Sequence, residues 1–248
     1  MGLHFVKASV MQTYHQIFLS WVFSTKSYWD LNYFFMVSKR LAVEGLLFQP
    51  WLLKEFPDIA HAIKAIPKNE VLQFFQELDQ AMKEGIRFTF PGDSDYPVTF
   101  YRMQEPPFFL NYLGKPSWKT GVCFSVVGSR DPSLNGYQWM EIYLPEVFRQ
   151  LQVLDQSIIL VSGGARGVDQ IGHSLAIRNK VPTCVFLPSG ILKMYPKELN
   201  DFKQEVLAGQ GAFVSEYRPN QNMHRGMFIQ RNRLISAISV STLVIDAG

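Results

Sequence analysis

The sequence predicts an α/β protein: a Rossmann-like, mostly parallel, doubly wound sheet preceded by a small helical domain. Two observations support this class. After residue 120, short apolar runs alternate with helix-like segments, the pattern of parallel sheets with helices on both faces. Before residue 86, aromatic and aliphatic residues instead recur at three- and four-residue spacing, which is typical of packed helices. At 248 residues, the chain is long enough for one or two domains.

Residues 1–85 are predicted to form the helical domain. Prolines and Gly45 divide the region into short helices, and Gly85 follows the last helix in the position of a C-terminal cap. Residues 86–120 are interpreted as a connector that packs on the sheet domain, beginning with a short strand at 86–90. The apolar stripes of the helical domain are Tyr14, Ile17, Phe18 and Trp21, and Val71, Phe74, Phe75, Leu78 and Met82.

Residues 121–248 are predicted to form the Rossmann-like domain. Sheets of this kind bind ligands beyond the carboxyl ends of their strands, and four of the predicted ends carry glycine, serine, arginine or glutamate. This edge is therefore the candidate ligand site. The five predicted strands are 124–127, 158–161, 183–187, 212–215 and 242–246. The four strand ends are Gly128-Ser129-Arg130, Ser162-Gly163-Gly164, Ser189-Gly190 and Ser215-Glu216.

The stretch IILVSGGARGVDQIGH, residues 158–173, indicates a buried strand, a glycine loop and a helix. Main-chain N–H groups and the helix dipole attract an anion at such a loop, and Arg166 adds a permanent charge, so we predict a phosphate site. Gly164 is expected to need a positive φ or close approach of a ligand, and Gly164→Val is expected to weaken binding more than stability. The alternative, that these glycines serve only a sharp turn, stays open.

Other patterns exclude several functions. The strand ends GSR and SGGARG do not match the GxGxxG dinucleotide fingerprint, and the sequence contains no GxxxxGK[ST] loop. The histidines lack metal-ligand spacing, so neither a metal site nor a cofactor is predicted. Two cysteines without a CxxC pair, no signal-peptide pattern and charges within the apolar stretch 17–37 predict a reduced, cytoplasmic protein without a membrane span. A net charge of +3 does not by itself identify a nucleic-acid binder.

Two more clusters carry chemistry. Asp169 and His173 lie one helical turn apart, and we interpret them as a helix-capping carboxylate and a packed imidazole rather than an acid–base pair. The cluster FIQRNRLI places Arg231, Asn232 and Arg233 near the helix start predicted at residue 230. We expect them to point toward the strand ends that carry the glycine loop, with a solvated helix end as the alternative.

Taken in order, the motifs FSVVGSR, VSGGARGVDQIGH, LPSGILKMYPKELN, SEYRPN and FIQRNRLISAIS resemble the DNA-processing protein A family, called DprA or Smf. The stretch DSDYPVTFYRMQEPPFFLNYLG resembles the lead-in of that family, so the resemblance covers residues 91–248. It implies an extended Rossmann-like fold that binds single-stranded DNA without evident catalysis. It also implies a homodimer that protects incoming strands and hands them to the RecA recombinase during natural transformation.

The resemblance implies a phosphate-binding face, which agrees with the interpretation of the loop above. The chain stops at Gly248, where family members continue, so we expect either a truncated chain or a smaller sheet. Whether the chain dimerises and whether its phosphate-binding face is complete depend on which of these two alternatives is correct. The implied binding residues are Arg130, Ser162, Gly163, Gly164, Arg166 and Gly167, with Arg231, Asn232 and Arg233 across the pocket.

Two other functions stay open at this point. A related Rossmann-like enzyme would bind or hydrolyse nucleotides or ADP-ribose derivatives, with Asp169, His173 or Glu216 acting on a glycosidic bond. Binding is favoured over hydrolysis because the glycine loop offers no closely spaced acidic pair. The third alternative is a non-functional remnant of a DNA-binding protein, which the stability of the expressed chain would distinguish.

Overall fold

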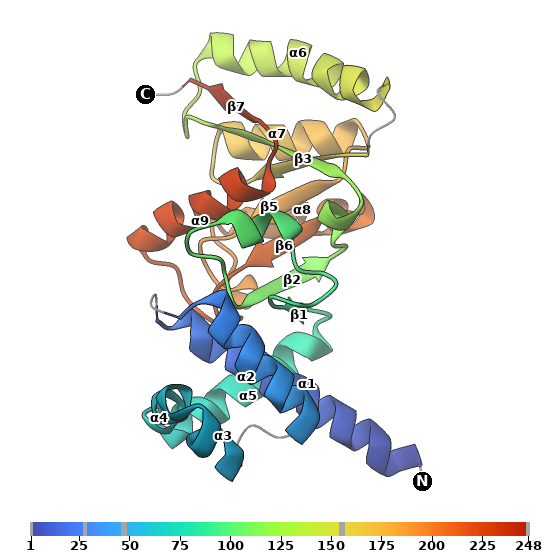
Figure 1. Ribbon diagram of the computed structural model, residues 1–248. Helices are drawn as coiled ribbons and strands as arrows, with labels where there is room; N and C mark the ends of the chain where they lie inside the picture. Colours follow the sequence, from blue (N-terminus) through green and yellow to red (C-terminus); the bar gives the residue numbers. More distant parts are fainter. Residues whose placement is uncertain (1, 27–28, 46–48, 154–156, 247–248) are drawn as a thin grey trace.

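The computed structural model describes residues 2–26, 29–45, 49–153 and 157–246. A helical unit lies at one end of the molecule and a layered sheet unit at the other (Figure 1). The α/β class, the mostly parallel sheet and the helices preceding it are all confirmed. In the described residues, no helix combines the length and the apolar character needed to cross a bilayer.

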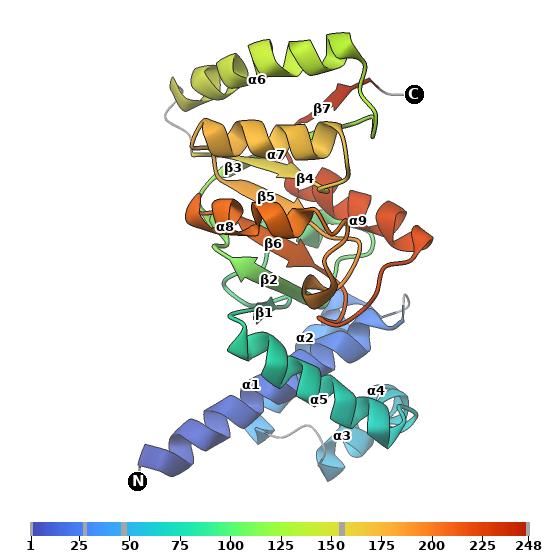
Figure 2. The same ribbon diagram turned by 180° about the vertical axis from the view of Figure 1, so that it is seen from behind.

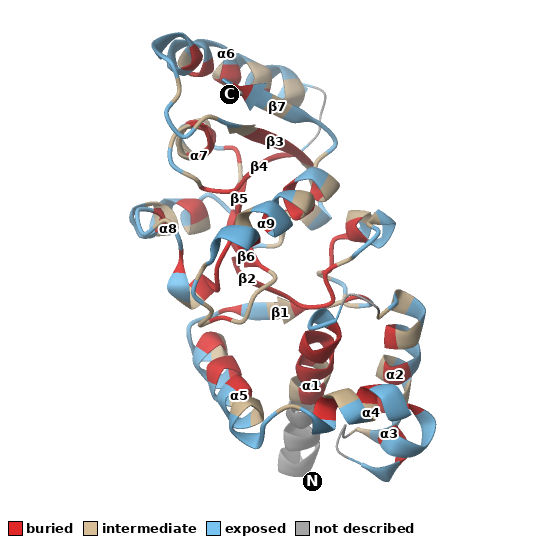
Figure 3. Cartoon of the chain, turned by 90° about the vertical axis from the view of Figure 1, so that its left-hand side faces the viewer, coloured by how far each residue is buried: buried red, intermediate tan, exposed pale blue. Residues whose placement is uncertain are grey.

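The helical unit is held together by an aromatic core. Phe18, Phe23, Phe34 and Phe74 are fully buried, and the buried part of α1 lies between α2 and α5 (Figure 3). Asp30 caps α2 by accepting the N–H of Tyr33, while α3 and α4 each begin with a proline. The helices are α1 (Gly2–Ser24), α2 (Leu31–Glu44), α3 (Pro50–Glu55), α4 (Pro57–Lys64) and α5 (Lys68–Lys83).

The sheet has seven strands in the order β1-β2-β6-β5-β4-β3-β7. The five strands predicted after residue 120 are present and run parallel. The segment 86–120, expected to pack on the sheet, instead contributes two of its strands: β1 at one edge, and β2, which pairs antiparallel with both β1 and β6. The strands are β1 (Arg87–Thr89), β2 (Leu110–Gly114), β3 (Val122–Gly128), β4 (Ile158–Ser162), β5 (Thr183–Phe186), β6 (Ala212–Ser215) and β7 (Thr242–Ile245).

Helices cover both faces of the sheet, as Figures 1 and 2 show. Alternate residues of each strand enter different cores: Val161 and Phe186 pack beneath α9, whereas Leu160 packs beneath α6 and α7. These helices are α6 (Leu134–Val153), α7 (Val168–Arg178), α8 (Leu199–Ala208) and α9 (Arg225–Ile238). Short 3₁₀ turns are η1 (Val98–Arg102), η2 (Ser117–Lys119) and η3 (Ile191–Lys193). Because α9 begins before the predicted start at residue 230, Arg231 lies inside this helix rather than at its N-terminus.

A buried ion pair joins the helical unit to the sheet unit. Arg218, in the loop after β6, donates from Nε and Nη2 to the Glu77 carboxylate of α5, at 3.1 and 2.9 Å. The same guanidinium lies 5.2 Å from the Trp21 ring centroid and 5.6 Å from that of Phe74. The two units therefore meet through a charged contact packed against aromatic rings.

Candidate functional site

A glycine loop joins β4 to α7 at the carboxyl edge of the sheet. Gly164 has φ +68° and Gly167 has φ +83°, so the positive φ expected for Gly164 is confirmed. A Cβ at Gly164 would lie 2.8 Å from Val185 and 2.9 Å from Leu199, both of which are buried. Gly164→Val would therefore disturb the core as well as the loop. These contacts predict a loss of stability for Gly164→Val, whereas its effect on binding stays a prediction.

Asp169, in the first turn of α7, holds the loop from its inner side. Its Oδ2 accepts the N–H of Gly163 at 3.1 Å and that of Ala165 at 3.2 Å. Burial raises the pKa of Asp169, while the positive charge of Arg231 and these N–H donors act in the opposite direction. The carboxylate thus organises the loop and is buried away from any ligand in the cleft above.

Three other loop N–H groups are available. Within the part of the chain that the structure describes, the amides of Gly164, Arg166 and Gly167 donate to no protein acceptor. They lie at the N-terminus of α7, where the helix dipole is positive. The arrangement favours an anion such as a phosphate, which can accept several hydrogen bonds at once.

Close backbone packing brings Arg130 toward the same loop. A Cβ at Gly167 would lie 2.5 Å from the carbonyl oxygen of Ser129 and 2.6 Å from that of Arg130, and Val168 N–H donates to Ser129 O at 3.1 Å. The segment after β3 is therefore fixed against the glycine loop. In the described residues, neither Arg130 nor Arg166 forms an ion pair or hydrogen bond, and both are exposed.

A cleft of about 680 Å³ opens between these loops. The Arg130 guanidinium carbon lies 5.3 Å from the Phe228 ring centroid, and the Tyr195 and Phe228 rings meet edge to face at 5.9 Å. Three cations and two carboxylates line the cleft beside these rings. The lining residues are Arg130, Asp131, Ala165, Arg166, Tyr195, Pro196, Lys197, Glu198 and Phe228.

Arg231 lies beneath the cleft and is buried, with 4% of its surface exposed. Its Nη1 donates to Phe186 O at 2.8 Å, and a Cβ at Gly163 would lie only 1.6 Å from the same nitrogen. Burial lowers the pKa of Arg231 to about 10, an effect that the Asp169 charge opposes, so the side chain stays cationic at neutral pH. Arg231 therefore fills the space that Gly163 leaves open.

The remaining implied binding residues lie away from the cleft. The buried Ser162 hydroxyl donates to Val126 O at 2.6 Å and joins two strands. Asn232 is exposed, while Arg233 pairs with Glu216 and lines a different cleft of about 940 Å³. Of the implied residues, Arg130 and Arg166 line the cleft. Gly163, Gly164 and Gly167 belong to the adjoining loop, where Gly163 and Gly164 are buried.

The residues considered for hydrolysis do not converge. The His173 ring is buried, its Nδ1 lies 2.6 Å from Thr183 Oγ1, and burial lowers its pKa to about 3. Burial raises the pKa of Glu216 to about 7 against the opposing charge of Arg233, in the cleft on the other side of α9. The Asp169 carboxylate accepts hydrogen bonds from the loop. Asp169, His173 and Glu216 thus have different partners and do not form one catalytic group. Among the described residues, no cluster of three or more His, Cys, Asp or Glu side chains has the arrangement of a metal site.

The sequence interpretation missed the aromatic and basic residues Tyr195 and Lys197, and it did not identify Phe228 as an aromatic wall of the cleft. The proline at position 196 indicates only the start of a helix at this point of the chain. Aromatic and basic residues alternate in KMYPK, residues 193–197, and this interleaving is a usable signal for nucleic-acid binding.

The fold and the loop define a class: Rossmann-like α/β proteins with a glycine loop at the carboxyl ends of a parallel sheet, where proteins of this kind bind ligands. Residues 87–248 match the model of the family described as DNA recombination-mediator protein A. Since this match covers more than half of the chain, the protein belongs to that family.

Curated relatives agree with this assignment. Protein Smf of Synechocystis sp. is 30% identical over 208 residues, covering 80% of this chain and 50% of that protein. DNA processing protein DprA of Bacillus subtilis is 27% identical over 184 residues, covering 72% of this chain and 60% of the relative. The chain thus spans about half the length of the curated relatives that it matches.

Two solved structures extend this result. DNA processing protein A from Streptococcus pneumoniae superposes with a TM-score of 0.64 at 21% identity, covering 94% of this chain and 73% of that one, which shows the shared fold. DNA processing protein A from Helicobacter pylori, described with a single-stranded DNA binding mode, matches with a TM-score of 0.53 at 26% identity. That match covers 64% of this chain and 68% of the neighbour.

Proposed function

We propose that this protein binds single-stranded DNA in the cleft beside the glycine loop, without catalysing a reaction. The observation that carries the proposal is that two exposed arginines without an ion pair, Arg130 and Arg166, line one cleft. The cleft lies beside a loop in which three amides have no acceptor among the described residues. The H. pylori neighbour, described with a single-stranded DNA binding mode, and the family membership support the choice of ligand. The proposal extends to a cytoplasmic role in DNA uptake, in which the protein protects incoming strands and helps to load RecA. We propose a homodimer as the functional oligomeric state.

The composition of the cleft favours a single strand over a duplex. Cations neutralise phosphates, loop amides can donate hydrogen bonds to them, and the Tyr195 and Phe228 rings offer surfaces on which unpaired bases can stack. A duplex keeps its bases stacked inside and cannot use these rings. Nucleotide or ADP-ribose hydrolysis has less support, because Asp169, His173 and Glu216 do not face one common reaction site.

The test removes the two exposed cations. Arg130→Ala/Arg166→Ala should weaken binding of oligothymidylate and reduce the log–log salt slope by roughly 0.7 for each phosphate that the variant no longer neutralises. Arg231 is unsuitable for this test because the side chain is buried and its removal would disturb the strand ends. Fluorescence anisotropy across a series of salt concentrations measures both quantities.

The matched control is Arg149→Ala. Arg149 is exposed on α6 and pairs with Glu146, so its removal should leave affinity and salt slope unchanged. The proposal fails if the folded wild-type chain prefers duplex DNA, or if it binds oligothymidylate no better than the Arg130/Arg166 double variant at low salt.

A further inference from the structure

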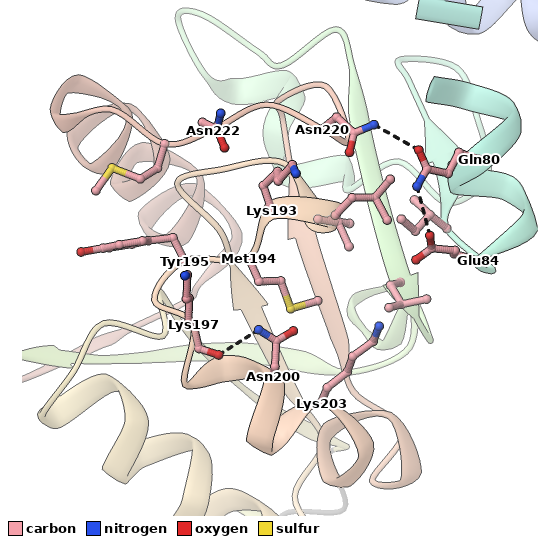
Figure 4. A pocket seen from close by; sticks show the side chains of 15 residues that line it. Gln80, Glu84, Lys193, Met194, Tyr195, Lys197, Asn200, Lys203, Asn220 and Asn222 are labelled. Carbon is pink, nitrogen blue, oxygen red and sulfur yellow. Dashed lines mark hydrogen bonds between the residues drawn. The ribbon is translucent and has the colours of Figure 1, made fainter. Parts of the chain in front are cut away.

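A second cavity of about 620 Å³ lies where the helical unit meets the sheet unit (Figure 4). Gln80 and Glu84 of α5 form one side, and residues from η3, α8 and the loop at 220–223 form the others. The volume falls in the range of about 300–1,000 Å³ in which pockets hold small-molecule ligands, so it has room for a nucleotide unit.

Lysines and amides surround an apolar floor in this cavity, which we call the lysine pocket. Three lysines, Lys193, Lys197 and Lys203, and one carboxylate, that of Glu84, line the pocket, so the net charge of the lining residues is positive. The amides are those of Gln80, Asn200, Asn220 and Asn222, and the buried floor is formed by Ile86, Leu113, Ile191 and Met194.

Hydrogen bonds hold the rim of the lysine pocket in place. The Asn220 amide donates to Gln80 Oε1 at 3.2 Å, and Gln80 Nε2 donates to Glu84 at 3.4 Å, which links the sheet unit to α5. Asn200 donates to the carbonyl oxygen of Lys197 at 2.8 Å. These contacts use the polar groups of the rim, while none of the three lysine ammonium groups forms an ion pair within the described residues.

The lysine pocket adjoins the glycine-loop cleft. Tyr195 and Lys197 line both cavities, so the two share a wall formed by one aromatic ring and one cation. Tyr195 is 39% exposed, which leaves its ring accessible along this wall. Alternation of cations with an aromatic surface is the pattern by which a groove tracks a single strand without reading its sequence.

We propose that the bound single strand leaves the glycine-loop cleft across Tyr195 and Lys197 and continues into the lysine pocket. This inference rests on the proposed function and adds a second binding segment to it. Lys193 and Lys203 contact phosphates there, and the apolar floor packs against a base or sugar. The helical unit contributes one wall of the site through Gln80 and Glu84, so the strand spans the junction between the two units.

The test compares a short and a long oligothymidylate, of about 5 and about 16 nucleotides, near the two ends of the usual range of site sizes. Lys193→Gln/Lys203→Gln removes both charges and keeps most of each side-chain stem. For the long strand, affinity should fall and the salt slope should decrease by roughly 1.4, corresponding to two single-strand phosphate contacts. For the short strand, which the glycine-loop cleft accommodates, both quantities should match the wild type.

The control Lys54→Gln/Lys64→Gln removes two exposed lysines from α3 and α4, at the far side of the helical unit, and should change neither strand's binding. Circular dichroism verifies that each variant is folded. The inference is overturned if the Lys193/Lys203 variant binds the long strand like the wild type, or if it loses affinity equally for both lengths. Failure of the wild type to bind either strand would instead refute the proposed function itself.

Discussion

At the scale of single residues, burial determines whether a charged or titratable side chain near the glycine loop can reach a ligand and whether it carries a charge. Arg231 belongs to the basic cluster of the sequence, yet its guanidinium donates to a strand carbonyl beneath the glycine loop. His173 lies in the same region, with 2% of its surface exposed and a hydroxyl partner in Thr183. A buried imidazole is neutral because water no longer stabilises its charged form.

His173 makes stability depend on pH. Burial lowers its pKa from 6.5 to about 3, so below pH 6.5 the unfolded chain takes up a proton that the folded chain does not bind until about pH 3. The free energy of unfolding should therefore fall by about 2 kcal/mol between about pH 7 and about pH 5 through this residue. His173→Gln should remove that part of the slope in urea unfolding. His61→Gln, at an exposed position of α4, should keep it, and equal slopes in wild type and His173→Gln would refute the assignment.

At the scale of secondary-structure elements, the candidate DNA-binding cleft depends on two loops, one after β3 and one after β4, whose backbones pack against each other. The loop after β3 carries Arg130 and the loop after β4 carries Arg166, and Gly167 is the point of closest approach between them. The separation of the two arginines is therefore set by a glycine that has no side chain, and Val168 N–H reinforces the contact by donating to Ser129.

Gly167→Ala should push these loops apart. The new methyl group would lie 2.5 Å from Ser129 O at a residue with φ +83°, so both the contact and the backbone conformation are strained. We expect weaker binding of single-stranded oligonucleotide together with a loss of stability of about 1–3 kcal/mol. Gly172→Ala in α7 is the matched control: its methyl group would make an ordinary contact of 3.6 Å with Val126, and stability should be kept or increased. Unchanged affinity in a folded Gly167→Ala chain would contradict this account.

Across the whole molecule, a charged and aromatic junction couples the helical unit to the sheet unit. Arg218 and Glu77 have side chains that are only 15% and 8% exposed, and the pair packs against Trp21 and Phe74. Phe108 and Phe109, which precede β2, also enter the aromatic core of the helical unit. The orientation of α5, and with it one wall of the lysine pocket, follows from these contacts.

Glu77→Gln should weaken this junction. The substitution removes the nearer of the two carboxylates that pair with the partly buried Arg218 and leaves only Glu70, whose Oε1 lies 3.5 Å from Arg218 Nη1. The expected cost is therefore at most about 3 kcal/mol, the lower end of the range for breaking a buried ion pair. Urea unfolding followed by tryptophan fluorescence measures the change in stability. Glu146→Gln, which removes the exposed partner of Arg149 on α6, should leave the unfolding curve nearly unchanged. Equal stabilities of the two variants would show that the junction contributes little.

The regular alternation after residue 120 is sufficient to predict the five parallel strands, because strands buried on both faces must be continuously apolar. The antiparallel strand β2 is not predicted by this pattern, because its place in the sheet depends on pairing with β6, which lies far along the chain. The glycine loop is predicted from its own residues, since Gly164 and Gly167 adopt conformations that side chains disfavour.

The amino-acid sequence is sufficient to predict the fold class, the family resemblance and the loop at which an anion is expected. Each of these depends on local periodicity or on a contiguous motif. The availability of each cation to a ligand follows instead from the three-dimensional packing. Arg231 and Arg233 are close together on α9, yet one lies beneath the glycine loop and the other pairs with Glu216 on the far side. Side-chain burial and partner choice depend on contacts between distant segments, which local sequence does not encode.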